Sequence, residues 1–344
     1  MAKQYKMVMT HFSKYLPPGK VTNDDLSKLM DTNDAWITER SGIRERRFVE
    51  ESVTTSDLGI EAVKNVLAAS NLKPSDFDYI IASTLSPDYY FPGIAPIIQH
   101  KLGFPTIPAI DIRVQCSAFV YSTQMAEAMI KSGQYKRILL VFSDVQSKML
   151  DLTTKGRNVA VLFGDGAAAV VCEAIECSEK EMPTVQNNVS GVIDTILGSD
   201  GIGAELLLTR SPGTATKGFM NSEAMENGDW HPTMEGRSVF KHAVTRMCEV
   251  AETLMKRHNI TANDLACLVP HQANLRISEM VREKMELPKE KVFNNIHCYG
   301  NTTSATIPIC INEAIEQGRL KKGDLILTVA FGAGFTWGGS LIRL

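Results

Sequence analysis

Hydrophobic and polar residues follow two patterns along this chain, one typical of amphipathic helices and one of buried strands. Within residues 57–70 apolar side chains recur at intervals of three and four, which predicts a helix with one buried face, and residues 238–258 show the same pattern. The short apolar runs at 79–82 and 267–270 predict buried strands. Helices that alternate with such strands indicate an α/β protein with mixed, mostly parallel sheets covered on both faces.

The same order of elements occurs twice, at an offset of about 187–188 residues. In each copy a second helix, a buried strand and a glycine-rich strand follow the first helix and strand. They are expected at 117–131, 136–142 and 163–171 in the first copy, and at 304–316, 324–330 and 334–342 in the second. The repeat predicts two duplicated halves, residues 1–182 and 183–344, related by a pseudo-two-fold axis.

Cys116 lies where an apolar, strand-like run ends and a helix pattern begins. A helix N-terminus presents unpaired N–H groups and the positive end of the helix dipole, so we expect a lowered thiol pKa there. The repeat offset makes the loop around Asn301 the mate of the Cys116 loop, and His271 follows the second copy's first strand. Each residue alone is consistent with packing or a turn. Their joint placement at strand and helix ends, where α/β proteins form sites, favours catalysis.

Cysteine, histidine and asparagine in this order occur in two classes of thiol enzyme. In papain-type proteases histidine is the base and asparagine orients it. In condensing enzymes cysteine carries an acyl group while histidine and asparagine stabilise an enolate. The chain shows no secretory leader, pro-segment or disulfide pattern, and a duplicated α/β frame is not the papain fold, so the condensing reaction is favoured.

Composition narrows the other possibilities. The 344 residues are 44% hydrophobic and 22% charged, with a net charge of -3, which gives no general basis for binding nucleic acid or anionic membranes. No apolar run reaches the roughly 18 residues of a membrane span. The seven cysteines are scattered, and neither Cys172 with Cys177 nor His297 with Cys298 has a second ligand pair, so no metal site is expected. We expect a cytoplasmic protein.

The motifs around these residues resemble those of the β-ketoacyl-acyl carrier protein synthase III family, in the thiolase superfamily. The resemblance covers nearly the whole chain and implies a homodimeric, five-layered α-β-α-β-α fold. Its most specific segments are Asp31 to Ile43 (DTNDAWITERSGI), the Cys116 loop, 163–166 (FGDG), 270–277 (PHQANLRI), 300–302 (GNT) and 331–338 (FGAGFTWG).

The resemblance also implies a reaction. Cys116 takes an acyl group from acyl-CoA, and malonyl-acyl carrier protein then binds and loses CO2. The enolate oxygen accepts hydrogen bonds from His271 Nε2–H and the Asn301 amide, and the carbanion attacks the acyl-Cys116 thioester. Backbone N–H groups of Cys116 and Ala333 form a second oxyanion site, with Ala333 replacing the family's usual glycine. Acyl-CoA and malonyl-acyl carrier protein are substrates, and no cofactor is expected.

The same resemblance assigns CoA-binding roles to Trp36, Arg40, Arg157 and Asn274. Trp36 stacks on the adenine with Arg157 on the other side, and Asn274 positions the pantetheine. The segment that contains Arg157 is two residues longer than usual, so Lys155 competes with Arg157 for this role.

Three further expectations concern partners and the acyl group. Lys241, Arg276 and Lys284 form a basic patch for the acidic carrier protein, although ordinary surface charge explains Lys284 equally well. Phe91 reaches across the dimer to shape the acyl pocket. Residues 198–236 form an extended, irregular, polar loop near the substrate entrance.

Two alternatives to this reaction stay open. One retains the acyl-Cys116 step but makes a different bond, by non-decarboxylative condensation or by transfer to another nucleophile in secondary metabolism. The other is a non-catalytic partner subunit, which the intact set of Cys116, His271 and Asn301 disfavours.

Overall fold

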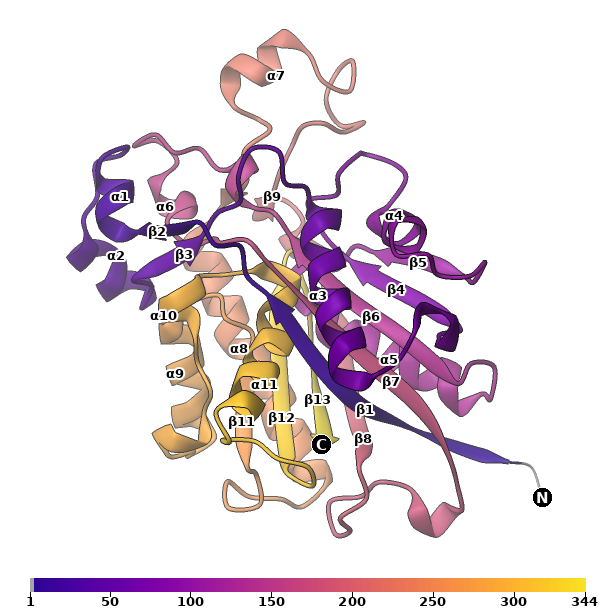
Figure 1. Cartoon of the computed structure of the whole chain (residues 1–344). Coiled ribbons are helices and arrows are strands. Elements are labelled where there is room, and N and C mark those ends of the chain that lie inside the picture. Colours follow the sequence, from indigo (N-terminus) through magenta and orange to yellow (C-terminus); the bar gives the residue numbers. More distant parts are fainter. Residues whose placement is uncertain (1–2) are drawn as a thin grey trace.

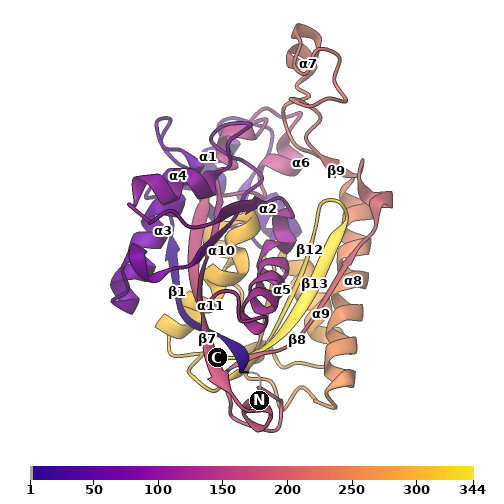
Figure 2. The ribbon, with the colours of Figure 1, turned by 90° about the vertical axis from the view of Figure 1, so that its right-hand side faces the viewer.

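Two β-sheets form the framework of the computed structural model, which describes residues 3–344 (Figures 1 and 2). The first sheet contains β1 (Gln4–Tyr15), β4 (Tyr79–Ser83), β5 (Ala109–Ile112), β6 (Arg137–Asp144) and β7 (Gly166–Cys177), in the order β1-β7-β6-β4-β5. The second contains β8 (Gly191–Ser199), β11 (Cys267–Pro270), β12 (Leu325–Gly332) and β13 (Thr336–Arg343), in the order β11-β12-β13-β8.

Helices form three layers around these sheets. The outer face of the first sheet is covered by α3 (Thr55–Ser70) and α4 (Ile94–Lys101), and that of the second by α8 (Gly236–Arg257) and α9 (Leu275–Lys284). Between the sheets lie α5 (Ala118–Lys131) and α11 (Thr306–Glu316), packed in one hydrophobic cluster with strands of both sheets. This is the predicted five-layered α-β-α-β-α fold.

Both sheets are mixed, but parallel pairing does not dominate them. The parallel pairs are β4–β5, β4–β6 and β11–β12, whereas β1–β7, β6–β7, β12–β13 and β13–β8 are antiparallel. The prediction of mixed, mostly parallel sheets is confirmed for strand direction: in each sheet a single glycine-rich strand, β7 or β13, folds back against the strand that precedes it and runs against the others.

The predicted helices and strands of the repeat are present in both halves, and each copy also contains a strand that was not predicted. β1 lies beside β7 in the first half, and β8 lies beside β13 in the second. The boundary between residues 1–182 and 183–344 stays a prediction. Within residues 3–344, no helix combines the length and the hydrophobicity that crossing a membrane requires.

A smaller group of elements lies at one end of the sheets. It contains β2 (Lys20–Thr22), α1 (Asn23–Ser27), α2 (Asp34–Ser41), β3 (Glu45–Arg47), α6 (Arg157–Ala160) and α10 (Ile296–Tyr299). The fully buried Arg46 donates to Asn23 Oδ1 at 2.8 Å and to the Val161 carbonyl at 2.9 Å. One side chain thus ties this group to the segment that precedes β7.

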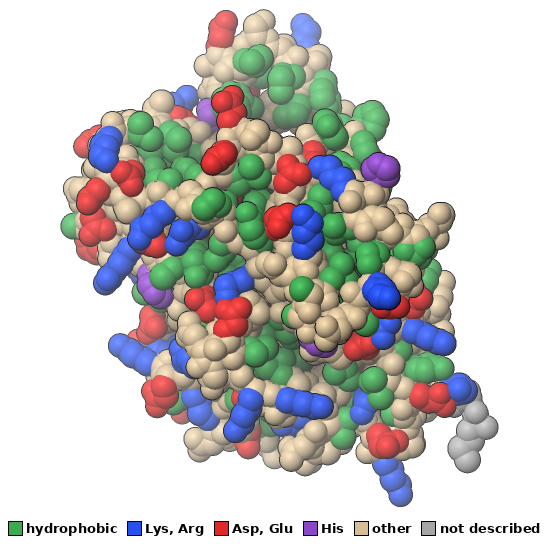
Figure 3. All heavy atoms as spheres, in the orientation of Figure 1, with side chains coloured by type: hydrophobic (Ala, Val, Ile, Leu, Met, Phe, Trp, Pro, Cys, Tyr) green, Lys and Arg blue, Asp and Glu red, His purple; other side chains and the backbone are tan. Residues whose placement is uncertain are grey.

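The ends of the predicted loop 198–236 belong to β8 and α8, and the chain between them forms a projecting arm. β9 (Leu207–Leu208) pairs with β10 (Thr233–Met234), and the chain between them, with α7 (Ser222–Asn227), extends beyond the rest of the molecule (Figures 1 and 2). Hydrophobic side chains gather on the arm (Figure 3), where Met220 is 43% and Met225 58% exposed. The arm is therefore more ordered and less polar than expected.

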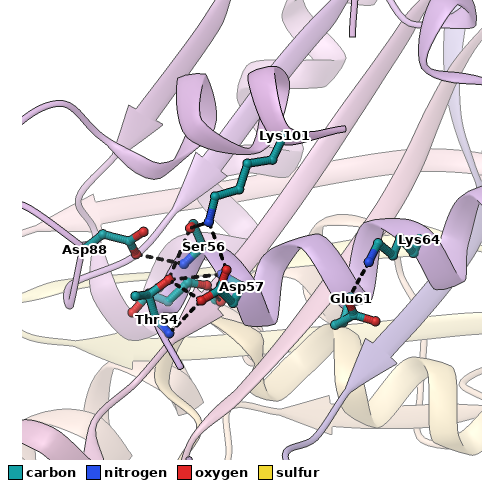
Figure 4. Close-up of polar contacts among 9 residues, drawn as sticks. Thr54, Ser56, Asp57, Glu61, Lys64, Asp88 and Lys101 are labelled. Atoms are coloured by element: carbon teal, nitrogen blue, oxygen red, sulfur yellow. Dashed lines mark hydrogen bonds and ion pairs between the residues drawn. The ribbon is translucent and has the colours of Figure 1, made fainter. Parts of the chain in front are cut away.

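The loop after β4, residues 84–93, is anchored on the N-terminus of α3 (Figure 4). Asp88 Oδ1 accepts a hydrogen bond from the Ser56 backbone N–H at 2.8 Å. Asp57 caps α3 and pairs with Lys101 of α4 at 2.9 Å. The Asp88 contact ties the loop that carries Phe91 to α3, and the Lys101 pair ties α4 to the same helix end.

Candidate active site

Cys116 lies in a single 3-10 turn, residues 115–117, directly before α5. Its side chain is 8% exposed, and burial raises the pKa of the thiol to about 12, an effect to which the Asp144 carboxylate adds. A hydrogen bond from the Asn301 side chain and the backbone N–H at the helix start act in the opposite direction. The expected lowering of the thiol pKa is therefore wrong: desolvation outweighs the helix N-terminus, and the resting thiol is protonated at neutral pH.

Asn301 is held beside Cys116 by its own backbone. It forms a parallel bridge with Phe163, and its N–H donates to the Leu162 carbonyl at 2.8 Å. Its side-chain Oδ1 accepts from the Thr303 N–H at 2.8 Å, so the NH2 group is the part left to donate into the site. The structure brings Cys116 and Asn301 together, as expected from the repeat.

His271 directly follows β11 and is 1% exposed. Its Nδ1 lies 2.6 Å from the Thr306 hydroxyl in the first turn of α11, and its Nε2 is buried without a partner among the described residues. Burial lowers the pKa of His271 to about 3, so the ring is neutral. The Thr306 hydroxyl also lies 3.3 Å from the Thr303 carbonyl, so its one proton has two acceptors within reach. In the tautomer in which this hydroxyl donates to Nδ1, the ring proton is on Nε2 and Nε2 is a donor.

The turn between β12 and β13 closes the other side of Cys116. A Cβ added to Gly332 would lie 2.8 Å from Cys116 Cβ and 3.1 Å from its backbone nitrogen, so the backbone here packs against the backbone of Cys116. The left-handed φ of the turn, +131°, belongs to Gly334, and Ala333 needs none. This explains how alanine is accommodated at a position where the resemblance implied glycine.

Trp36 is flanked by two guanidinium groups. Arg40 lies 4.5 Å and Arg157 5.2 Å from its ring centre. Lys155 instead donates to the Asn227 carbonyl at 3.3 Å, at the end of α7. The geometry favours Arg157 over Lys155 as the cation beside Trp36.

Asn274 connects this region to α9. Its amide donates to the Arg40 carbonyl at 2.9 Å, and its Oδ1 accepts from the Arg276 N–H at 2.9 Å as the cap of the helix. The side chain therefore positions Arg40 within the protein.

The three predicted patch residues differ in their contacts. Lys241 and Arg276 are exposed on α8 and α9, and the Arg276 guanidinium lies 5.5 Å from the Phe240 ring centre. Lys284 pairs with Glu252 at 3.2 Å, which leaves less of its charge available to a partner.

Phe91 projects from the 84–93 loop with 79% of its surface exposed. The neighbouring Tyr90 makes an edge contact with Phe219 of the arm, with ring centres 4.9 Å apart. The loop and the arm thus present one apolar surface.

Sequence reasoning missed Thr306, Gly332 and the buried Asp144. The repeat offset was the available signal, because all three lie at ends of repeated elements. Across residues 3–344, no group of three or more His, Cys, Asp or Glu residues could hold a metal ion.

A duplicated five-layered fold that places a buried cysteine, an asparagine and a histidine at helix and strand ends defines a condensing enzyme of the thiolase class. A family model for 3-oxoacyl-[acyl-carrier-protein] synthase III matches residues 110–201, and the model for its C-terminal part matches residues 255–344. The chain therefore belongs to the β-ketoacyl-[acyl-carrier-protein] synthase III family, and it is an acyltransferase.

Three similar proteins illustrate the match. The β-ketoacyl-[acyl-carrier-protein] synthase III of Koribacter versatilis is 39% identical, covering 97% of both chains. That of Caldanaerobacter subterraneus is 41% identical, covering 96% of this chain and 95% of its own. The crystal structure of the Aquifex aeolicus synthase III has a TM-score of 0.85 at 38% identity, covering 99% of this chain and all of that one.

Proposed function

We propose that the protein condenses an acyl-CoA primer with malonyl-acyl carrier protein, releasing CO2 and forming a β-ketoacyl product that starts an acyl chain. The observation that carries this proposal is a buried thiol, Cys116, next to an amide donor, Asn301, together with a neutral His271. His271 contacts Thr306, five residues after Asn301, and its Nε2 has no protein partner among residues 3–344. Donors left unpaired in a buried site are available for a developing negative charge.

In the first half-reaction the Cys116 sulfur attacks the acyl-CoA carbonyl. A C–S bond forms to Cys116, the bond to CoA breaks, and CoA leaves with the thiol proton. The backbone N–H groups of Cys116 and Ala333 stabilise the carbonyl oxygen. Because one thioester replaces another, the step needs no external energy source.

In the second half-reaction the malonyl carboxylate leaves as CO2, and its bonding electrons form an enolate. His271 Nε2–H and the Asn301 NH2 group donate to the enolate oxygen. A pKa of about 3 keeps His271 neutral, so it donates a hydrogen bond rather than a proton. The enolate carbon then attacks acyl-Cys116, and the thiolate is the leaving group.

The substrates are held outside this centre. Trp36, Arg40 and Arg157 bind the CoA nucleotide through stacking and charge, while Asn274 positions Arg40. An adenine ring would displace one of the two guanidinium groups from Trp36.

Two partners complete the proposal. Lys241 and Arg276 offer positive charge to an acidic carrier protein, with Lys284 a weaker contributor. The chain forms a homodimer in which the exposed Phe91 shapes the partner's acyl pocket. The reaction needs no cofactor, and the free thiols of the described cysteines fit the reducing cytoplasm.

Intact-mass spectrometry after incubation with acetyl-, octanoyl- and longer acyl-CoA tests the proposal. We expect a Cys116 adduct with at least one donor, then CO2 release and a β-ketoacyl product when malonyl-acyl carrier protein is added. Absence of any adduct contradicts an acyl-transfer function. An adduct without CO2 release supports the alternative in which another nucleophile takes the acyl group.

A further inference from the structure

Asp144, the last residue of β6, is a fully buried carboxylate that receives five hydrogen bonds. Oδ1 accepts from the Leu85 N–H at 2.8 Å, the Thr84 hydroxyl at 3.1 Å and the Ser86 hydroxyl at 3.4 Å. Oδ2 accepts from the N–H and hydroxyl of Ser304, at 3.0 and 2.5 Å. Within residues 3–344, no lysine or arginine pairs with it.

The donors belong to two loops that serve different halves of the proposed reaction. Thr84 and its neighbours begin the 84–93 loop, which carries Phe91. Ser304 lies between Asn301, the proposed enolate donor, and Thr306, which holds His271 Nδ1. One carboxylate from the first half of the chain therefore joins the acyl-pocket loop to the loop that prepares the enolate site.

The carboxylate of Asp144 also interacts electrostatically with the thiol of Cys116. Burial raises the pKa of Asp144, but both its oxygens face backbone N–H groups, which can only donate, and the donors favour the ionised form. His271 and Asn301 are neutral, so among the described groups near the thiol Asp144 supplies the charge. A negative charge there opposes formation of the Cys116 thiolate.

We propose that Asp144 is a positioning residue for the condensation step, which fixes the Asn301 loop against the acyl-pocket loop. This inference rests on the proposed roles of Cys116, His271 and Asn301. Ionised Asp144 has a second consequence: it adds to the burial that keeps the free thiol protonated, and an acyl group on Cys116 removes the charge conflict. The carboxylate therefore favours the acylated over the ionised form of Cys116.

The variant Asp144→Asn separates these effects. The amide must place its NH2 group against the N–H of either Ser304 or Leu85, so two donors meet and the two loops shift relative to each other. We expect malonyl decarboxylation by the acylated enzyme to fall about 10- to 100-fold. Loss of the buried charge moves the pH profile of Cys116 alkylation by iodoacetamide downward by about one unit. A merely structural defect lowers both activities and leaves that profile in place.

Ser304→Ala is the matched control, because it removes one hydrogen bond to Asp144 but keeps the charge. We expect slower decarboxylation with no downward shift of the alkylation profile. Equal loss of acyl loading and decarboxylation in both variants, or an unshifted profile in Asp144→Asn, overturns the inference. If Asp144→Asn does not fold, Ser304→Ala decides it alone: selective loss of decarboxylation supports the positioning role, and any other result overturns it.

The proposed function is tested separately from this inference. Acyl loading of the unmodified enzyme decides the proposed function, and the alkylation profile needs no substrate. A wild-type protein that forms no acyl adduct contradicts the proposed function whatever the Asp144 variant does. A loaded wild type with an unaltered Asp144→Asn variant contradicts only the role of Asp144.

Discussion

The turns that precede α5 and α11 occupy equivalent positions in the repeat. Their backbone conformations are similar, but their side chains differ in chemistry. Each is a short 3-10 turn, and each is entered through a non-glycine residue in the left-handed region, Gln115 (φ 42°) and Thr303 (φ 51°). These two residues are 188 positions apart, and the same offset pairs Cys116 with Ser304. The duplicated fold therefore supplies two equivalent positions, and we propose that one of them, Cys116, carries the nucleophile.

The surroundings of the two positions explain the difference. β6 ends at Asp144, which binds the Ser304 hydroxyl, whereas the equivalent end of β12 is Gly332, packed against Cys116. Likewise β4 ends at Ser83 while the equivalent residue after β11 is His271, whose Nε2 is unpaired. Around Ser304, polar groups satisfy one another. Around Cys116, a glycine allows close packing of the backbone, and the nearby strand end carries a histidine nitrogen without a partner among the described residues.

The test of this comparison with the largest expected effect replaces Cys116 and its equivalent, Ser304, separately by alanine. We expect Cys116→Ala to lose the acyl adduct entirely and condensation by at least about 1000-fold, because no other group can carry the acyl chain. Ser304→Ala should still form the adduct. Intact mass after acyl-CoA treatment measures both variants. An acyl group found on Cys116→Ala, or absent from Ser304→Ala, would contradict the assignment of the acyl group to Cys116 rather than to Ser304.

The second test concerns the histidine and its mate. His271→Ala removes a donor to the enolate and should slow CO2 release about 100- to 1000-fold, with a smaller effect on acyl loading. Ser83→Ala should affect CO2 release far less, because its hydroxyl donates to the Ile112 carbonyl rather than into the site. Release of labelled CO2 and single-turnover loading report the two steps. If His271→Ala slows both steps equally, the enolate role is contradicted.

A third and smaller effect is expected at the strand ends. Gly332→Ala places a Cβ 2.8 Å from Cys116 Cβ, so the turn must shift, at a cost of about 1–3 kcal/mol. We expect acyl loading to fall about 10- to 100-fold and the melting temperature to drop. Thermal unfolding and loading kinetics measure this. Unchanged loading would show that the contact with glycine does not shape the nucleophile's position.

The repeat in the sequence predicted the helices, the buried strands and the positions of Cys116, His271 and Asn301, because periodicity and strand ends are local signals. β1 and β8 were missed, since their residues are only partly buried and lack a continuous apolar run. The direction of the Cys116 pKa was also missed. A helix N-terminus is visible in sequence, whereas the desolvation and the Asp144 charge that outweigh it depend on tertiary packing.

The smallest effect is expected where the chain departs from its family, in the turn that follows Gly332. The positive φ there belongs to Gly334, so Ala333 already has a conformation open to any residue, and a glycine in its place gains no needed freedom. Ala333→Gly should keep condensation within about twofold and lower stability by about 0.4–1 kcal/mol, because glycine increases the entropy of the unfolded chain. Thermal unfolding and steady-state condensation rates measure both. A markedly faster condensation rate in this variant would mean that Ala333 strains the second oxyanion site. The N–H groups of Ala333 and Cys116 would then be placed less favourably for the carbonyl oxygen than the backbone of the turn implies.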